Sequence, residues 1–94
     1  MHEAGVAQRL LGVVLERAAR SGATRVVTVE LEAGPESAVS DEAVRFHWAE
    51  VARGTPAEGA VLHVVPVAEA TAFRVVAIEV PDDAGGGAVG TDRV

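Results

Sequence analysis

The spacing of hydrophobic residues changes along the chain from a helical period to a strand period, and this change constrains the fold most. Over Glu3–Arg20 the hydrophobic residues recur every three or four positions, which predicts an amphipathic helix. Gly22 follows this segment and suits the left-handed position that ends a helix. Over Arg25–Ala33 hydrophobic and polar residues alternate, which predicts a strand with one apolar and one wet face.

The rest of the chain predicts a second helix and two further strands. Ser40 is a favourable N-cap for a helix that continues to about Arg53. The segments Ala60–Pro66 and Phe73–Val80 are rich in Val and Ile, which favours strands. Because only about six residues separate these two segments, we expect them to pair as an antiparallel hairpin.

The order helix, strand, helix, strand, strand predicts a two-layer α/β fold. The strand–helix–strand portion over Arg25–Pro66 should form a right-handed crossover with parallel strands. We therefore expect a small mixed three-stranded sheet with two helices on one face, forming one domain over residues 1–81. Residues 82–94 show no periodicity and contain three consecutive glycines, so we expect them to be a disordered Gly-rich tail.

Composition excludes several kinds of site and partner. The chain has no Cys, which removes disulfides, thiolate catalysis and sulfur-bound zinc, so a metal would need N and O ligands. The net charge is −6 and the basic residues are single, scattered arginines, so we expect no nucleic-acid partner. No segment approaches the roughly 20 apolar residues that span a bilayer, and the start lacks a secretory signal. We therefore expect a cytoplasmic protein without a membrane partner.

The N-terminal triplet Met1-His2-Glu3 brings an α-amine, an imidazole and a carboxylate together. A histidine at position two can chelate a divalent metal through the amine, the intervening amide nitrogen and imidazole Nδ1. Planar, nitrogen-rich ligand sets of this kind suit Ni(II) or Cu(II). The chelate requires a free Met1 amine, because acetylation or an upstream extension removes the amine or shifts the histidine out of register.

Other polar residues give weaker patterns. His63, flanked by valines in a predicted strand, and His47, beside two aromatic residues, are interpreted as surface residues rather than metal ligands. Glu30 and Glu32 share one strand face and are interpreted as a solvated face rather than an acid/base pair. No pattern orders a Ser, His and Asp relay, so we predict no catalytic residues and expect that the chain is not an enzyme.

The triplet and several framework segments occur in the order and spacing of one family. These segments are Gly34 with Ser37-Ala38 and an acidic helix start, Gly54-Thr55, Glu58-Gly59-Ala60-Val61-Leu62, and Ile78-Glu79-Val80. Over about residues 1–83 the chain resembles the hydrogenase-maturation nickel metallochaperones (the HypA/HybF family). The resemblance implies that Ni(II) binds at Met1 and His2 with Glu3 as neighbour. The acidic residue that the family uses near nickel aligns with Ser40, and the adjacent Asp41 is a further candidate ligand.

The resemblance also implies partners, and the chain departs from the family in one respect. In that family the protein hands nickel to a partner GTPase and to the hydrogenase large subunit. Family members insert a four-cysteine zinc domain at the position where residues 67–72 stand here, so we expect the zinc lobe to be absent and no zinc to bind. The leading hypothesis is a nickel metallochaperone-like protein that serves maturation of a NiFe hydrogenase or a urease.

Two other hypotheses remain open from the residues. The first is a metal-free protein-interaction paralogue that keeps the fold and a docking surface of this family. The second is a small metal-dependent enzyme with His2 and Glu3 as acid and base, which the short chain disfavours because little length is left to form a pocket.

Overall fold

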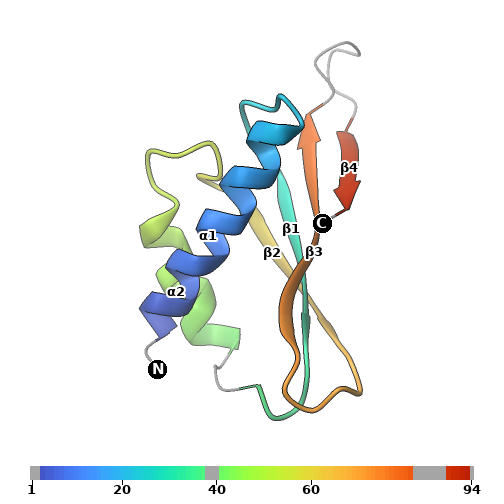
Figure 1. Ribbon diagram of the computed structural model, residues 1–94. Helices are drawn as coiled ribbons and strands as arrows, with labels where there is room; N and C mark the ends of the chain where they lie inside the picture. The colour runs from blue at the N-terminus through green and yellow to red at the C-terminus, as the bar shows by residue number, and fades with distance from the viewer. Residues whose placement is uncertain (1–2, 38–40, 82–88, 94) are drawn as a thin grey trace.

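Two layers, one of helices and one of strands, make up the described part of the chain. The computed structural model describes residues 3–37, 41–81 and 89–93; Met1, His2, 38–40, 82–88 and Val94 lie outside it. The elements are, in order, α1 (Glu3–Arg20), β1 (Thr28–Ala33), α2 (Asp41–Val51), β2 (Val61–Pro66), β3 (Phe73–Pro81) and β4 (Val89–Arg93). Both helices lie on one face of the sheet (Figure 1). The predicted two-layer fold and the order of elements through β3 are confirmed.

Helix α1 ends where the sequence predicts. Gly22 has a φ of 72°. Its N–H donates to the Ala19 carbonyl at 3.1 Å, and the N–H of Ala23 donates to the Ala18 carbonyl at 2.9 Å. This pair of bonds is the Schellman arrangement, which satisfies carbonyls that the end of a helix leaves open. The turn sends the chain back along the sheet as β1.

Strand β1 lies inside the sheet, between β2 and β3. The strand order is β2-β1-β3-β4, with β1 parallel to β2 and antiparallel to β3. The predicted parallel pair is therefore confirmed, and the predicted hairpin between β2 and β3 is wrong. Val29 and Leu31 of β1 are completely buried. Because water does not reach the backbone of a buried strand, its N–H and C=O groups need a hydrogen-bonded strand on each edge. A six-residue connection easily spans the ~10 Å between strands two places apart.

A bulge in β3 sets which of its residues face the helices. Glu30 pairs with Ala77 and Leu31 with Val75, so one residue of β3, Val76, has no partner on β1. Residues three apart point to opposite faces of a regular strand. The extra residue therefore lets Val75 and Ile78 both be buried on the helix side of the sheet.

The C-terminal segment departs from the predicted disordered tail over 82–94. That prediction is wrong for Val89–Arg93, which form β4 and pair antiparallel with β3, with Thr91 opposite Glu79. Residues 82–88 lie outside the described residues. The edge of β3 presents backbone N–H and C=O groups that any strand can bond, whatever its hydrophobic pattern. Periodicity did not predict β4 because backbone pairing has no such signature.

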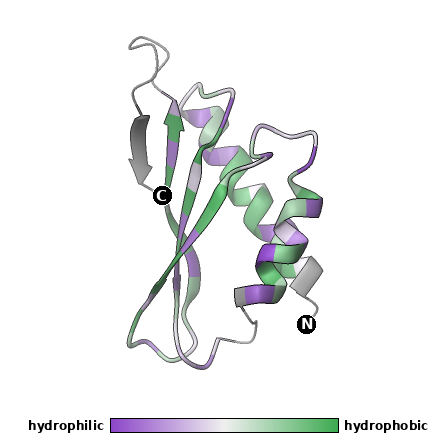
Figure 2. Ribbon diagram, turned by 180° about the vertical axis from the view of Figure 1, so that it is seen from behind, coloured by the Kyte–Doolittle hydropathy of each residue, from purple (hydrophilic) through white to green (hydrophobic). Residues whose placement is uncertain are grey.

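The hydrophobic core lies between the helices and the sheet. Apolar residues alternate with polar ones along the strands (Figure 2). The largest completely buried side chains are Leu31, Ile78, Val14, Val26, Val29 and Val44. Trp48 is 4% exposed, and its Nε1 donates to the Ala60 carbonyl at 3.1 Å, which ties α2 to the start of β2. Each helix thus contributes one apolar stripe to a core of mostly small aliphatic side chains.

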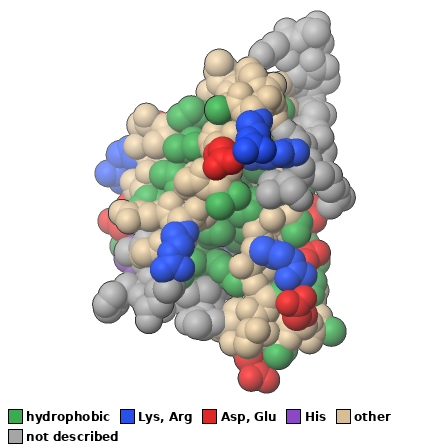
Figure 3. All heavy atoms as spheres, viewed as in Figure 1, with side chains coloured by type: hydrophobic (Ala, Val, Ile, Leu, Met, Phe, Trp, Pro, Cys, Tyr) green, Lys and Arg blue, Asp and Glu red, His purple; other side chains and the backbone are tan. Residues whose placement is uncertain are grey.

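The surface carries dispersed charge. On the face seen in Figure 3, arginine side chains are separated from one another by hydrophobic and acidic residues. On α1, Arg20 pairs with Glu16 one helical turn away, at 3.0 Å between Nη2 and Oε1. Neither α1 nor α2, the helices of the described part, has the length and apolar content needed to cross a membrane.

The central position of β1 predicts the cost of a cavity there. We expect Leu31→Ala to lower the free energy of unfolding by about 2–5 kcal/mol, because Leu31 is completely buried. The matched control is Val13→Ala on α1, where the side chain is 44% exposed and we expect a change below about 1 kcal/mol. Urea unfolding followed by the fluorescence of Trp48, the one Trp of the chain, measures both. Equal losses in the two variants would contradict the assignment of β1 to the core.

Candidate metal centre

Both helices begin at the same end of the molecule. Glu3 is the first residue of α1 and Asp41 the first residue of α2, and the two helices pack against each other. Their N-terminal ends lie together at the lower end of the view in Figure 1. The positive end of each helix dipole favours acidic residues there, and both helices begin with one.

The predicted ligand set is only partly within the described residues. Met1 and His2 lie outside them, and Glu3 and Asp41 are placed as the first residues of their helices. The fold therefore brings the two helix starts, which lie far apart in the sequence, to one end of the helical layer. Metal binding by Met1, His2, Glu3 and Asp41 stays a prediction.

Within residues 3–37, 41–81 and 89–93 no three His, Asp or Glu residues gather closely enough to hold a metal ion. His47 on α2 has its Nδ1 3.4 Å from Oε1 of Glu50, and its ring meets Phe46 edge-on at 5.2 Å. His63 is exposed on β2, in register with Glu30 of β1. These two imidazoles therefore lie in surface environments, on different layers of the fold.

The connection between β2 and β3 is joined to the chain leaving β1 by two backbone hydrogen bonds. The N–H of Gly34 donates to the Ala72 carbonyl at 2.8 Å, and the N–H of Glu36 donates to the Ala70 carbonyl at 2.7 Å. We call this pair of bonds the loop latch. A Cβ on Gly34 would lie 1.9 Å from the Glu69 carbonyl oxygen, so the two segments approach this closely only because residue 34 is glycine.

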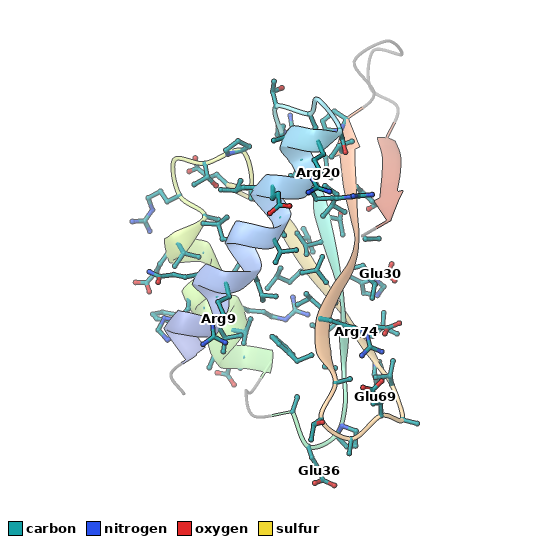
Figure 4. All side chains as sticks on the ribbon, in the orientation of Figure 1. Arg9, Arg20, Glu30, Glu36, Glu69 and Arg74 are labelled. Carbon is teal, nitrogen blue, oxygen red and sulfur yellow. The ribbon has the colours of Figure 1, made fainter. Side chains whose placement is uncertain are left out.

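An ionic cluster holds the other side of the same connection. Arg74 on β3 donates from Nε to Glu32 Oε1 at 3.0 Å and from Nη1 to Glu69 Oε1 at 3.2 Å. Hydrogen bonds to Glu32 and then to Glu69 raise the pKa of Arg74 above its usual value, since both carboxylates favour the charged guanidinium. Figure 4 shows Arg74 and Glu69 pointing toward each other. The pairs lie at the surface, so each contributes little to stability.

The sequence did not predict this cluster. Alternation places Glu32 on the polar face of β1, and the structure binds its carboxylate to Arg74, leaving the Glu32 side chain 28% exposed. The two residues are 42 positions apart in the sequence. They meet only because β3 pairs with β1, with Glu32 opposite Arg74 in the register. A signal for this contact would have required knowledge of that register.

An apolar cleft of about 470 Å³ opens between the two segments that the loop latch joins, the start of α2 and the sheet. Its walls include Pro35 and Ser37 after β1, Val44 in the first turn of α2, and Val67 and Phe73 at the two ends of the connection. The carboxyl ends of β1 and β2, the connection and the start of α2 therefore meet around one cavity. The cleft lies at the end of the molecule where both helices begin.

Comparison with known proteins gives a family. Residues 1–75 match the family described as hydrogenase/urease nickel incorporation, metallochaperone, HypA. The chain is 40% identical over 65 residues to hydrogenase maturation factor HypA of Paracoccus denitrificans and 45% identical over 60 residues to that of Methanopyrus kandleri. These matches cover 69% and 64% of this chain, and 58% and 42% of the relatives' own lengths. The chain thus spans about half the length of these relatives.

A solved structure shares the fold. The solution structure of the Ni metallochaperone HypA from Helicobacter pylori superposes with a TM-score of 0.76, over 85% of this chain and 97% of that one. The aligned residues are 15% identical. At this level of identity the likeness concerns the arrangement of helices and strands.

The close contact at Gly34 predicts the effect of a single methyl group. We expect Gly34→Ala to lower the free energy of unfolding by about 1–3 kcal/mol, because the new Cβ overlaps the backbone of the connection. Gly12→Ala on α1 is the matched control: nothing lies within 4 Å of its Cβ, and Ala in a helix should stabilise by about 0.5–1 kcal/mol. Thermal unfolding by circular dichroism measures both. Equal stability of Gly34→Ala and the native chain would contradict the latch geometry.

Proposed function

The chain belongs to the HypA family of hydrogenase/urease nickel-incorporation metallochaperones, and from this we propose that it binds Ni(II) at its N-terminus and supports maturation of a nickel enzyme. The observation that carries the proposal is the extent of the family match. It runs from Met1 into β3 and so includes the chelating triplet and the starts of both helices.

The proposed ligands have the chemistry that nickel requires. The Met1 amine, the backbone nitrogens that follow it and the His2 imidazole supply nitrogen donors, while Glu3 and Asp41 supply carboxylates. Ni(II) accepts square-planar or tetragonal sets of such N and O donors. A chelate at a chain end leaves the ion open on one side, so a partner can replace its ligands one at a time. We therefore propose a carrier that releases its cargo rather than an enzyme.

The proposed partners follow from the family resemblance. They are the maturation GTPase and the large subunit of a NiFe hydrogenase, with a urease as the other nickel enzyme that the family description names. Transfer of this kind would take place in the cytoplasm. These 94 residues contain no Cys and cannot form a four-cysteine zinc site.

The metal site is tested by nickel titration followed by calorimetry. We expect one Ni(II) per chain, with affinity reduced at least about 100-fold in His2→Ala and in protein acetylated at Met1, because each change removes a nitrogen donor. Acetylation is selective because the chain has no Lys and its α-amine is the only primary amine. His63→Ala, an exposed histidine of β2, is the matched control and should bind like the native chain.

The same titration has a defined dependence on pH. Protons compete with nickel for an amine and an imidazole, which ordinarily ionise between about pH 6 and 8, so affinity should fall as the pH is lowered through this range. Equal affinity in the native, acetylated and His2→Ala proteins would contradict the proposed metal site at the N-terminus. That result would favour the metal-free interaction paralogue.

Delivery is tested in cells that lack their own HypA-family protein. We expect the native chain to restore hydrogenase activity at limiting nickel and His2→Ala to restore at least about tenfold less, because loss of a ligand removes the cargo. Excess nickel in the medium should remove the difference between the two. If His2→Ala restores as much activity as the native chain, the protein acts without carrying the metal.

A further inference from the structure

Strand β3 has a backbone edge that β4 covers only in part. Residues 77–81 pair with β4, in a register that places Ala77 opposite Arg93 and Pro81 opposite Val89. In the part of the chain that the structure describes, no strand pairs with residues 73–76 on this edge. Backbone N–H and C=O groups of an open edge can bond another extended strand.

The opposite edge of the sheet is less suited to a further strand. On the outer side of β2, Arg45 of α2 donates from Nη1 to the Leu62 carbonyl. Pro66, at the end of β2, has no backbone N–H to donate. A covered carbonyl and a proline both oppose the addition of a strand. The edge of β3 is therefore the place where the sheet can be extended.

The sequence of β3 is complementary to itself in charge. In an antiparallel pair of two β3 strands, Arg74 of each copy can lie opposite Glu79 of the other. These residues are in register with Glu32 and Thr28 of β1, and Figure 4 shows Arg74 on the side of the sheet away from the helices. Arg74 is 46% exposed although it binds Glu32, and a guanidinium has five N–H donors. This register therefore gives two attractive charge pairs between the copies.

The same register matches the two faces of the strand. Val76 of one copy lies opposite Ala77 of the other, so the bulges of the two strands meet and neither strand has an unmatched residue. On the helix side the pairing joins residues that belong to the core or pack against it: Phe73 opposite Val80 and Val75 opposite Ile78. Such cross-strand apolar pairs stabilise a sheet. β3 thus fits a second copy of itself without a polar residue on the core side.

We propose that a second copy of this chain binds the β3 edge in this register, and that β4 is a guard strand that competes with it from within the chain. The dimer pairs residues 73–80, eight in each copy, against the five of β3 that pair with β4. It is two-fold symmetric and joins the two sheets into one. This inference is independent of the nickel site.

The guard strand is favoured by its covalent connection rather than by its sequence. Gly90 lies inside β4, and glycine weakens a strand. Residues 82–88 tether β4 to β3, and a short flexible tether gives an effective concentration of the order of millimolar. We therefore expect the native chain to be mostly monomeric at micromolar concentrations and to dimerise when β4 is detached.

The guard is tested with Gly90→Pro/Thr91→Pro, called the guard-off variant. Neighbouring residues of a strand direct their N–H groups to opposite sides, so the two prolines remove at least one bond to β3. Sedimentation velocity over a range of concentrations should give a dimer dissociation constant at least about tenfold lower than that of the native chain.

A reversible lock tests the same competition from the other direction. Val80 and Gly90 are partners in the register, and the chain has no Cys, so Val80→Cys/Gly90→Cys carries the only two thiols. The oxidised protein should stay monomeric at concentrations where the native chain dimerises. Reduction should restore dimerisation in the same sample. This comparison keeps the test valid if the guard-off variant does not fold.

The register is tested with two charge reversals in the guard-off background. Glu79→Arg places Arg opposite Arg74, and Arg74→Glu places Glu opposite Glu79, so each variant should dimerise at least about tenfold more weakly. An equimolar mixture should form heterodimers as tight as the guard-off dimer, because both charge pairs are then attractive. Glu30→Arg on β1 is the matched control and should dimerise like the guard-off variant, since β1 is not at the edge.

Each outcome decides the proposal. A guard-off variant that stays monomeric at every concentration, or an oxidised lock that dimerises like the native chain, overturns the competition between β4 and a second copy. A mixture of the charge variants that associates no better than either alone overturns the register. Release of dimers by the guard-off variant, together with heterodimers in the mixture, supports both parts.

Discussion

The burial of β1 in the middle of the sheet is the constraint on which the rest of the structure depends. Val29 and Leu31 are completely buried, with β2 bonded on one edge and β3 on the other. To place strands that are close in sequence on opposite sides of β1, the chain between them must pass the end of β1. It meets there the segment that continues from β1, and the close approach at Gly34 is the result.

This crossing places the loop between β2 and β3 at the end of the molecule where both helices begin. The crossing loop, the turn after β1 and the starts of both helices are all found there (Figure 1). Backbone groups of the two crossing segments bond each other at Gly34 and Ala72, the buried residues of the crossing, which satisfies donors and acceptors that would otherwise be left open there. The crossing loop, the segment after β1 and the first turn of α2 therefore border one cleft.

The candidate site could be predicted from the sequence to the extent that its chemistry is local. Met1 and His2 are adjacent, so their capacity to chelate a metal needs no tertiary contact to be recognised. Asp41 was a weaker candidate, because its distance from Met1 in space depends on how α1 packs against α2. Arg74 and Gly34 carried no signal at all: their contacts join segments that are far apart in the chain, and a glycine or an exposed arginine suits many environments.

The sequence by itself determined the elements from α1 to β3, since hydrophobic period, caps and the Gly22 helix stop act over a few residues. It also determined the parallel pairing of β1 with β2, because a strand–helix–strand connection leaves little choice. Only the tertiary structure decided that β3 pairs with β1 instead of β2, that a bulge at Val76 buries both Val75 and Ile78, and that β4 covers the edge of β3. Strand neighbours and register depend on backbone hydrogen bonds between distant segments, and those bonds are the same for every side chain.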